Sequence, residues 1–210
     1  MWDRLQRQWF LPVNHLARHT SWAHGPMRTY AELGIVLFGL VLVIAWWSAR
    51  RANDPRRMAT ALWTPVGALV AIALNQPLGR LVHEPRPFTV FPHALTLVAR
   101  SHDFSFPSDH AVMAGAVTAG VLLVDRRLGL VTAVAALVLA FARVYVGVHF
   151  PLDVVAGLAF GALITLAGYV VVRRPLEAAV GGLARTRLRT LVGRRAEGDP
   201  TRRQRLHPGA

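Results

Sequence analysis

The sequence contains neither cysteine nor lysine, and each absence narrows the chemistry that is open to this chain. Without cysteine there can be no disulfide, no thiolate metal site and no thiol nucleophile. All 24 basic residues are arginines, and only 11 acidic residues oppose them, which leaves a formal net charge of +13. Such a charge could indicate nucleic-acid binding. The arginines, however, cluster between apolar runs and near the C-terminus, so no nucleic-acid partner is expected.

Charge of either sign is scarce, because charged residues make up 17% of the chain and hydrophobic residues 53%. This balance is typical of an integral membrane protein. A bilayer core requires roughly 17–25 helical residues per crossing, and an open sheet cannot cross it. We therefore predict an all-α polytopic membrane bundle of five to six helices. Its apolar stretches are 30–47, 58–82, 110–124, 128–142 and 152–172, of which the third and fourth need flanking residues to span.

The first 29 residues differ from these stretches. Trp2, Leu5, Trp9 and Phe10 alternate with arginine and glutamine, which predicts an amphipathic helix lying at headgroup depth. A re-entrant or sixth spanning helix is the alternative. The segment is not typical of a signal peptide, since no apolar core follows its first charges. Insertion is therefore expected to depend on the predicted membrane domain, residues 30–172.

The arginines predict the orientation of that domain. They lie between the first and second stretches, between the third and fourth, and throughout residues 173–210. All three regions fall on one side of the membrane, which the positive-inside rule assigns to the cytoplasm. The Arg-rich tail, 173–210, is expected to be disordered and to lie near anionic headgroups. The opposite face then carries the 81–107 and 145–151 loops.

Those two loops and the span ends beside them hold most of the unusual polar residues, and several suit a phosphate. Arg86 and Arg143 offer guanidinium groups that can donate two hydrogen bonds to an oxyanion. Ser108 precedes an apolar helix and is predicted to be its N-cap, so the following amides and the helix dipole favour an anion. Taken alone, an Arg-Pro pair is usually an ordinary loop and Pro-Ser-Asp an ordinary cap.

Two histidines on the same face could supply a nucleophile and a proton donor. These are His110 and His149. Asp153 follows His149 by four residues, one helical turn, so its carboxylate could orient that imidazole. Taken alone, this His–Asp pair could equally be a structural hydrogen bond. The residues by themselves therefore predict an anion site with histidines.

The order and spacing of these motifs resemble the type 2 phosphatidic acid phosphatase superfamily, which shares its site with vanadium haloperoxidases. The resemblance covers about residues 75–157 and rests on Arg-Pro, then Pro-Ser-X-His, then Arg with five residues to His and three more to Asp. It implies that His149 attacks phosphorus, that Asp153 orients it, and that His110 protonates the leaving oxygen. It further implies oxyanion contacts from Arg86, Ser108, Arg143 and the Asp109 backbone N–H, with no metal and no cofactor.

The sequence also departs from the superfamily pattern. The usual lysine is Gly79, and either Arg80 or His83 is considered as its replacement. The usual serine before Arg143 is Ala142, and the usual glycine of Pro-Ser-Gly-His is Asp109. Glu-Pro-Arg-Pro-Phe together with Phe-Pro-Ser-Asp-His is similar to the bacitracin-resistance subgroup of undecaprenyl-diphosphate phosphatases. That subgroup implies cleavage of undecaprenyl diphosphate at the outer face of a bacterial plasma membrane.

Other functions stay open at this point. The same fold could act on phosphatidic acid, phosphatidylglycerol phosphate or another lipid monophosphate. A protein of a different class, which binds lipids or anions without turnover, would carry the same cationic loops. A haloperoxidase is disfavoured, because those enzymes resemble soluble bundles and this chain is built of apolar stretches.

Overall fold

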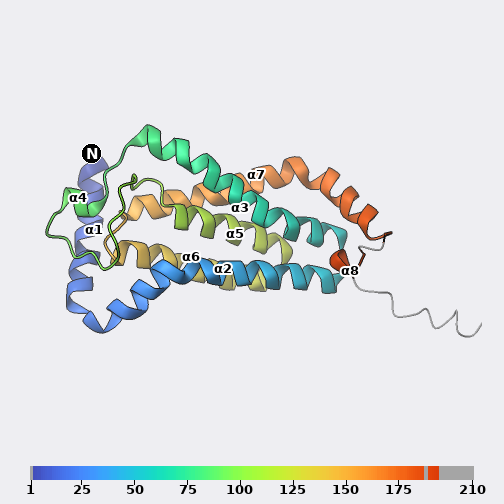
Figure 1. Cartoon of the computed structure of the whole chain (residues 1–210), viewed down its shortest axis with the longest axis horizontal. Helices are drawn as coiled ribbons and strands as arrows, with labels where there is room; N and C mark the ends of the chain where they lie inside the picture. The colour runs from blue at the N-terminus through green and yellow to red at the C-terminus, as the bar shows by residue number, and fades with distance from the viewer. Residues whose placement is uncertain (1, 187–188, 194–210) are drawn as a thin grey trace, which may run out of the picture.

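The computed structural model describes residues 2–186 and 189–193, and all regular secondary structure in this part of the chain is helical. Its long helices lie side by side along one axis, while α1 crosses one end of the bundle (Figure 1). The elements are α1 (Trp2–His19), the short 3-10 helix η1 (Ser21–Ala23), α2 (His24–Ala52), α3 (Pro55–Val82), α4 (Pro87–Val90), α5 (Asp109–Val124), α6 (Arg126–Tyr145), α7 (Pro151–Leu183) and α8 (Arg189–Val192).

Four helices are long and apolar enough to cross a membrane, namely α2, α3, α6 and α7. They contain four of the five apolar stretches, so the predicted multi-pass helical fold is confirmed. The remaining stretch forms α5, which has 16 residues and lies packed among α3, α6 and α7. Glycines allow this contact. A Cβ at Gly115 would overlap the backbone of Leu158, and one at Gly161 would overlap that of Val112.

The structure corrects two predicted boundaries. Helix α2 begins at His24, inside the segment 1–29 that was expected to precede the spans. Pro26 sits in its first turn, where proline is well tolerated. Helix α7 continues to Leu183, into the predicted tail 173–210, because Leu176 and Val180 pack against the main core. Residues 194–210 lie outside the described part of the chain, so disorder there stays a prediction.

Helix α1 has two unlike faces, as its amphipathic sequence predicts. Phe10, Asn14 and Ala17 are buried, whereas Trp9 and Leu11 on the other side are about half exposed. The helix is not among the described segments that are apolar enough to span a bilayer. It instead covers the end of the bundle where α5 and α7 begin (Figure 1). The predicted site residues all lie at this end.

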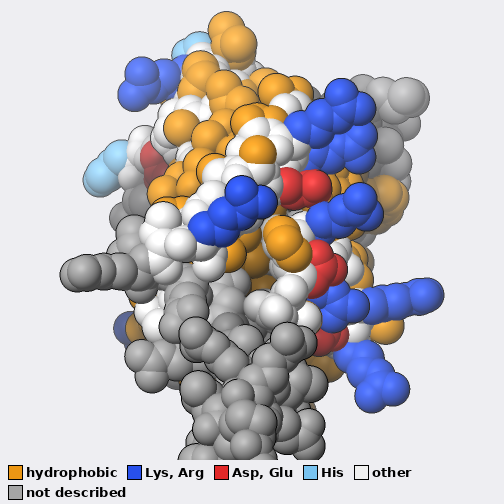
Figure 2. Space-filling view, turned by 90° about the vertical axis from the view of Figure 1, so that its right-hand side faces the viewer, with side chains coloured by type: hydrophobic (Ala, Val, Ile, Leu, Met, Phe, Trp, Pro, Cys, Tyr) orange, Lys and Arg blue, Asp and Glu red, His pale blue; other side chains and the backbone are white. Residues whose placement is uncertain are grey.

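Arginines gather at the opposite end, where α8 lies and where α2 and α7 end (Figure 2). Arg50 and Arg51 lie over the ring of Trp47, and Arg50 donates to the Thr190 carbonyl at 2.6 Å. Asp125 caps α6 by accepting from the Leu128 and Arg127 amides. These amide hydrogen bonds lower the pKa of its carboxyl group. The bundle therefore has one end rich in exposed arginine and one end that buries its polar groups.

Candidate active site

The turn between α6 and α7 presents His149 to the interior. Gly147 reverses the chain with a φ of +82°. A Cβ at this position would collide with the Leu95 carbonyl oxygen, so only glycine allows the loop to approach so closely. Phe150 then caps α7, and Pro151 occupies its first turn, where proline is favoured. This turn leaves the His149 imidazole only 2% exposed.

Two guanidinium groups meet the Nε2 atom of His149. Arg86 Nη1 and Arg143 Nη2 each lie 3.3 Å from it. Guanidinium nitrogens only donate, so Nε2 must be the unprotonated acceptor of the ring. The Nδ1 atom therefore carries the proton, and it lies 2.9 Å from the backbone oxygen of Ser105. This tautomer leaves the Nε2 lone pair directed at the two cations.

Burial lowers the pKa of the His149 imidazole well below its ordinary value, and the charges of Arg143 and Arg86 lower it further. The ring is therefore neutral at neutral pH. A neutral imidazole between two cations can act as a nucleophile towards an electrophile whose negative oxygens those cations hold.

Arg86 is fixed from several directions before any ligand arrives. It is buried, and its Nη1 donates to the Val148 carbonyl at 2.9 Å. Its Nη2 forms an ion pair of 2.9 Å with Asp103. Burial raises the pKa of the Asp103 carboxyl, but hydrogen bonding by Ser101 and the charge of Arg86 outweigh this, and the net pKa is lowered. Asp103, which the sequence did not single out, is therefore an anionic partner already present at the site.

Arg143 joins the site to α2, because its Nη1 donates to the Ala31 carbonyl at 3.2 Å. Its buried Nε has no partner among the described residues. His110, in the first turn of α5, lines the same cavity of about 410 Å³ as Arg86, Arg143 and His149. The structure thus brings both histidines and both arginines of the predicted set into one cavity.

Asp153 lies beside His149, as the four-residue spacing predicts, but not as its shortest contact. Its Oδ2 is 3.5 Å from Nδ1 of His149. The same oxygen accepts from the Phe150 amide at 2.7 Å and from the Ser105 hydroxyl. The carboxylate is fully buried and is tied to the start of α7.

Ser108 precedes α5 as predicted, yet its side chain does not cap the helix. The hydroxyl is fully buried and has no hydrogen-bond partner among the described residues. The expected capping bond is therefore absent, and the backbone N–H of Ser108 donates to the Asp153 carbonyl at 3.2 Å. Ser108 connects α5 to α7 and keeps an unpaired hydroxyl at the start of α5.

Asp109 lines the cavity, and its carboxylate accepts hydrogen bonds from two side chains of α3. Asn75 donates to it at 2.7 Å and Gln76 at 3.1 Å. Arg80 lines an adjoining hollow with these amides, while the His83 ring packs edge-on against Phe104 at 4.7 Å. Neither Arg80 nor His83 is among the described residues that line the cavity of His149.

Helix α1 supports the site from outside. Phe10 is fully buried, stacks on Phe91 and meets the ring of Phe150 edge-on at 5.5 Å. Gln6 donates to Glu84 at 2.8 Å, and Asn14 exchanges two hydrogen bonds with the Leu95 backbone. The sequence identified the amphipathic helix but had no signal for these contacts, which join residues about 80 positions apart.

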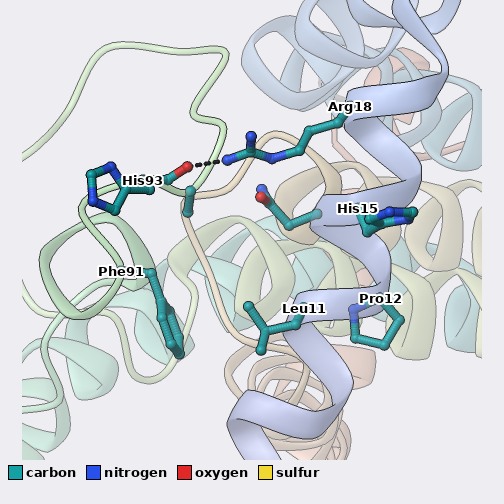
Figure 3. A pocket seen from close by; sticks show the side chains of 8 residues that line it. Leu11, Pro12, His15, Arg18, Phe91 and His93 are labelled. Atoms are coloured by element: carbon teal, nitrogen blue, oxygen red, sulfur yellow. Dashed lines mark hydrogen bonds between the residues drawn. The ribbon is translucent and has the colours of Figure 1, made fainter.

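A larger cavity of about 580 Å³ lies between α1 and residues 91–94 (Figure 3). There Arg18 reaches across to the His93 carbonyl, and Leu11, His15 and Phe91 line the space. None of the predicted site residues is among the residues that line it, so this larger cavity is not the one that holds the candidate phosphate site.

Comparison with known proteins identifies the family. The model of the PAP2 superfamily matches residues 60–176, which is more than half of the chain. The chain belongs to the PAP2 superfamily. It is a multi-pass membrane protein and a lipid phosphatase of that superfamily.

The names of two relatives refer to different lipid substrates. The chain is 28% identical to undecaprenyl-diphosphatase BcrC of Bacillus subtilis over 74% of its own length and 78% of the relative. It is 43% identical to lipid A 1-phosphatase of Rhizobium johnstonii, over 50% of this chain and 43% of that protein.

A solved structure shares the fold. The PAP2-type phosphatidylglycerolphosphate phosphatase of Bacillus subtilis superposes with a TM-score of 0.60 at 22% identity, covering 86% of this chain and 89% of that one. The comparisons therefore establish a PAP2 lipid phosphatase and leave the lipid itself open.

Proposed function

We propose that this protein hydrolyses undecaprenyl diphosphate to undecaprenyl phosphate and inorganic phosphate through a phosphohistidine on His149. The observation that carries the proposal is the Nε2 atom of His149 set 3.3 Å from each of two guanidinium groups. The similarity to undecaprenyl-diphosphatase BcrC over most of both chains supports the diphosphate substrate.

The reaction follows from this arrangement. Arg86 and Arg143 hold the oxygens of the terminal phosphate, and the Ser108 hydroxyl and the Asp109 backbone N–H complete the set of donors. Nε2 of His149 forms a bond to phosphorus, and the bond to the bridging oxygen breaks. His110 donates a proton to that oxygen, so undecaprenyl phosphate leaves. Water then attacks the phosphohistidine, His110 takes back a proton, and inorganic phosphate is released.

We further propose that hydrolysis needs no metal ion. The guanidinium groups of the buried Arg86 and the half-buried Arg143 already provide two positive charges where a transferring phosphoryl group would lie. Their planar N–H groups match the geometry of phosphate oxygens.

The proposed location of the site is the outer face of a bacterial plasma membrane. The arginines at the far end of the bundle support this, because the positive-inside rule would place that end in the cytoplasm (Figure 2). Helix α1, with its half-exposed Trp9 and Leu11, would then lie at the outer headgroups.

The decisive test is phosphate release from undecaprenyl diphosphate in detergent, comparing the wild-type protein with His149→Ala. We expect removal of the nucleophile to lower kcat by at least about 1000-fold. His19→Ala removes an exposed histidine on α1 and serves as the matched control. Equal rates for wild type and His149→Ala would contradict the phosphohistidine route.

A second candidate substrate is a lipid monophosphate. The 43% identity to a lipid A 1-phosphatase favours it, although that match covers half of the chain. Rates should therefore be compared on undecaprenyl diphosphate, lipid A, phosphatidylglycerol phosphate and phosphatidic acid. A kcat/KM that is highest for one of the monophosphates would replace the diphosphate proposal. Binding of these lipids without release of phosphate from any of them would indicate a non-enzymatic role.

A further inference from the structure

Ser105 lies outside every motif that the sequence singled out, yet it contacts both partners of the proposed nucleophile pair. It is fully buried in the segment between α4 and α5. Its backbone N–H donates to the Glu84 carbonyl at 2.8 Å, which fixes the segment near Arg86. A buried serine with this many contacts has little freedom to move.

The backbone oxygen of Ser105 selects the tautomer of His149. It lies 2.9 Å from Nδ1, whereas the nearest Asp153 oxygen lies 3.5 Å from the same atom. The shorter contact is the normal length of an N–H···O hydrogen bond, and the longer one is at its limit. Ser105 is therefore the main acceptor of the Nδ1 proton, and this leaves Nε2 free to attack.

The hydroxyl of Ser105 holds the carboxylate. It donates to Asp153 Oδ2 and lies 3.5 Å from Nδ1 of His149. Asp153 Oδ2 also accepts from the Phe150 amide. One residue thus fixes the proton of the imidazole through its backbone and the orientation of the aspartate through its side chain.

We propose that Ser105 is a positioning residue for the nucleophile, so that the working unit is Asp153, Ser105 and His149 rather than the aspartate and histidine alone. This inference rests on the proposed role of His149. Ser105 acts through the other two residues, because it is not among the described residues that line the cavity of Arg86, Arg143 and His149. Its loss should therefore slow the chemical step more than it weakens substrate binding.

The test is a set of kinetic constants for Ser105→Ala, Asp153→Asn and the double variant, with Ser21→Ala as an exposed serine control. Small displacements of a reacting group cost up to about 100-fold in rate, so we expect kcat of Ser105→Ala to fall by about 10- to 100-fold with KM within about threefold. The double variant should be hardly slower than Asp153→Asn, because the hydroxyl acts through that carboxylate. Fully additive losses, or a wild-type kcat in Ser105→Ala, would overturn the inference.

A measurement on the wild-type protein does not depend on how the variants fold. Nitrogen NMR of histidine-labelled protein, assigned with His149→Ala, should show His149 as the neutral tautomer protonated on Nδ1. A ring protonated on Nε2 would overturn the inference. Failure of the proposed function would look different, since the wild-type protein and His149→Ala would then release phosphate at the same rate.

Discussion

Arginine behaves differently at the two ends of this bundle. At the α1 end, Arg86 is buried and donates to backbone carbonyls, to Asp103 and towards His149. At the other end, Arg50 and Arg51 lie over the rings of Trp46 and Trp47 near the surface. Arginine is thus buried in a network of hydrogen bonds at one end, whereas at the other end it lies over tryptophan rings near the surface, with one hydrogen bond from Arg50 to the Thr190 carbonyl. This difference supports the proposal that the first end binds an anion.

The largest effect should come from changing the guanidinium while keeping its charge. Arg86→Lys loses the planar set of donors that reaches Val148, Asp103 and His149, and we expect kcat/KM to fall by about 100-fold or more. Arg50→Lys makes the same exchange at the other end and should leave kcat/KM within about twofold. Steady-state kinetics on both variants measure the contrast. Similar losses in the two would mean that the comparison of the ends is wrong.

The next effect concerns glycines, which again differ between the ends. Gly147→Ala places a Cβ against the Leu95 carbonyl at a positive φ, so we expect a loss of at least about 2 kcal/mol in stability. Gly181→Ala lies in α7 near the arginine end, where an added Cβ meets no atom, and should stabilise by about 0.5–1 kcal/mol. Thermal unfolding in detergent tests both signs. A stabilised Gly147→Ala would show that the turn does not require glycine.

A smaller effect concerns pH. The pKa of His149 lies below its ordinary value of 6.5, so the imidazole stays neutral at that pH. We therefore expect kcat/KM to decline with acid only at pH values below 6.5. Replacing Arg143 by Gln removes a positive charge that lowers this pKa, and the limb should move to higher pH. Rate profiles from pH 4 to pH 8, on the order of one point per half unit, measure the shift. An acidic limb that stays in place in Arg143→Gln would argue against the charge coupling.

The same group makes stability depend on pH. In the unfolded chain the His149 imidazole has its ordinary pKa of 6.5. In the folded protein its pKa is lower, so the ring stays neutral at more acidic pH. The unfolded state therefore binds more protons below pH 6.5, and the contribution of His149 to folding becomes less favourable as pH falls. His149→Ala should lose this part of the pH dependence, which thermal unfolding at two pH values can measure.

The smallest expected effect is that of removing divalent metal. If Arg86 and Arg143 supply the charge at the phosphate, as we propose, EDTA should leave phosphate release unchanged within experimental error. The measurement is the wild-type rate with EDTA and with added magnesium. A rate abolished by EDTA and restored by magnesium would refute the metal-free proposal.

Much of the fold was predictable because it depends on local composition. Runs of apolar residues indicate helices that cross a bilayer, and four such helices are present. The C-terminal extent of α7 was not predictable in the same way. Arg173 and Arg174 indicate the end of a span, but Leu176 and Val180 continue the helix by packing against the core. That packing depends on helices distant in the sequence.

Motif spacing in the sequence was enough to predict which histidines and carboxylate come together at the candidate site. His149 and Asp153 are four residues apart across the start of α7, and His110 lies in the first turn of α5, so their meeting at one end follows from topology. The sequence offered Arg80 or His83 in place of the usual lysine, and neither is among the described residues that line the cavity of His149. Gly79 and Arg80 both line the adjoining hollow instead, so the position of the usual lysine itself lies beside that hollow.

The sequence by itself determined the membrane helices, the cluster of arginines at one end, and the set of residues that we propose to bind and attack a phosphate. Only the tertiary structure decided the partners of these residues. It placed Asp103 on Arg86, the Asn75 and Gln76 amides on Asp109, and Ser105 on both His149 and Asp153. A buried polar group must find a hydrogen-bond partner, and where helices meet, that partner comes from whichever distant segment is packed against it.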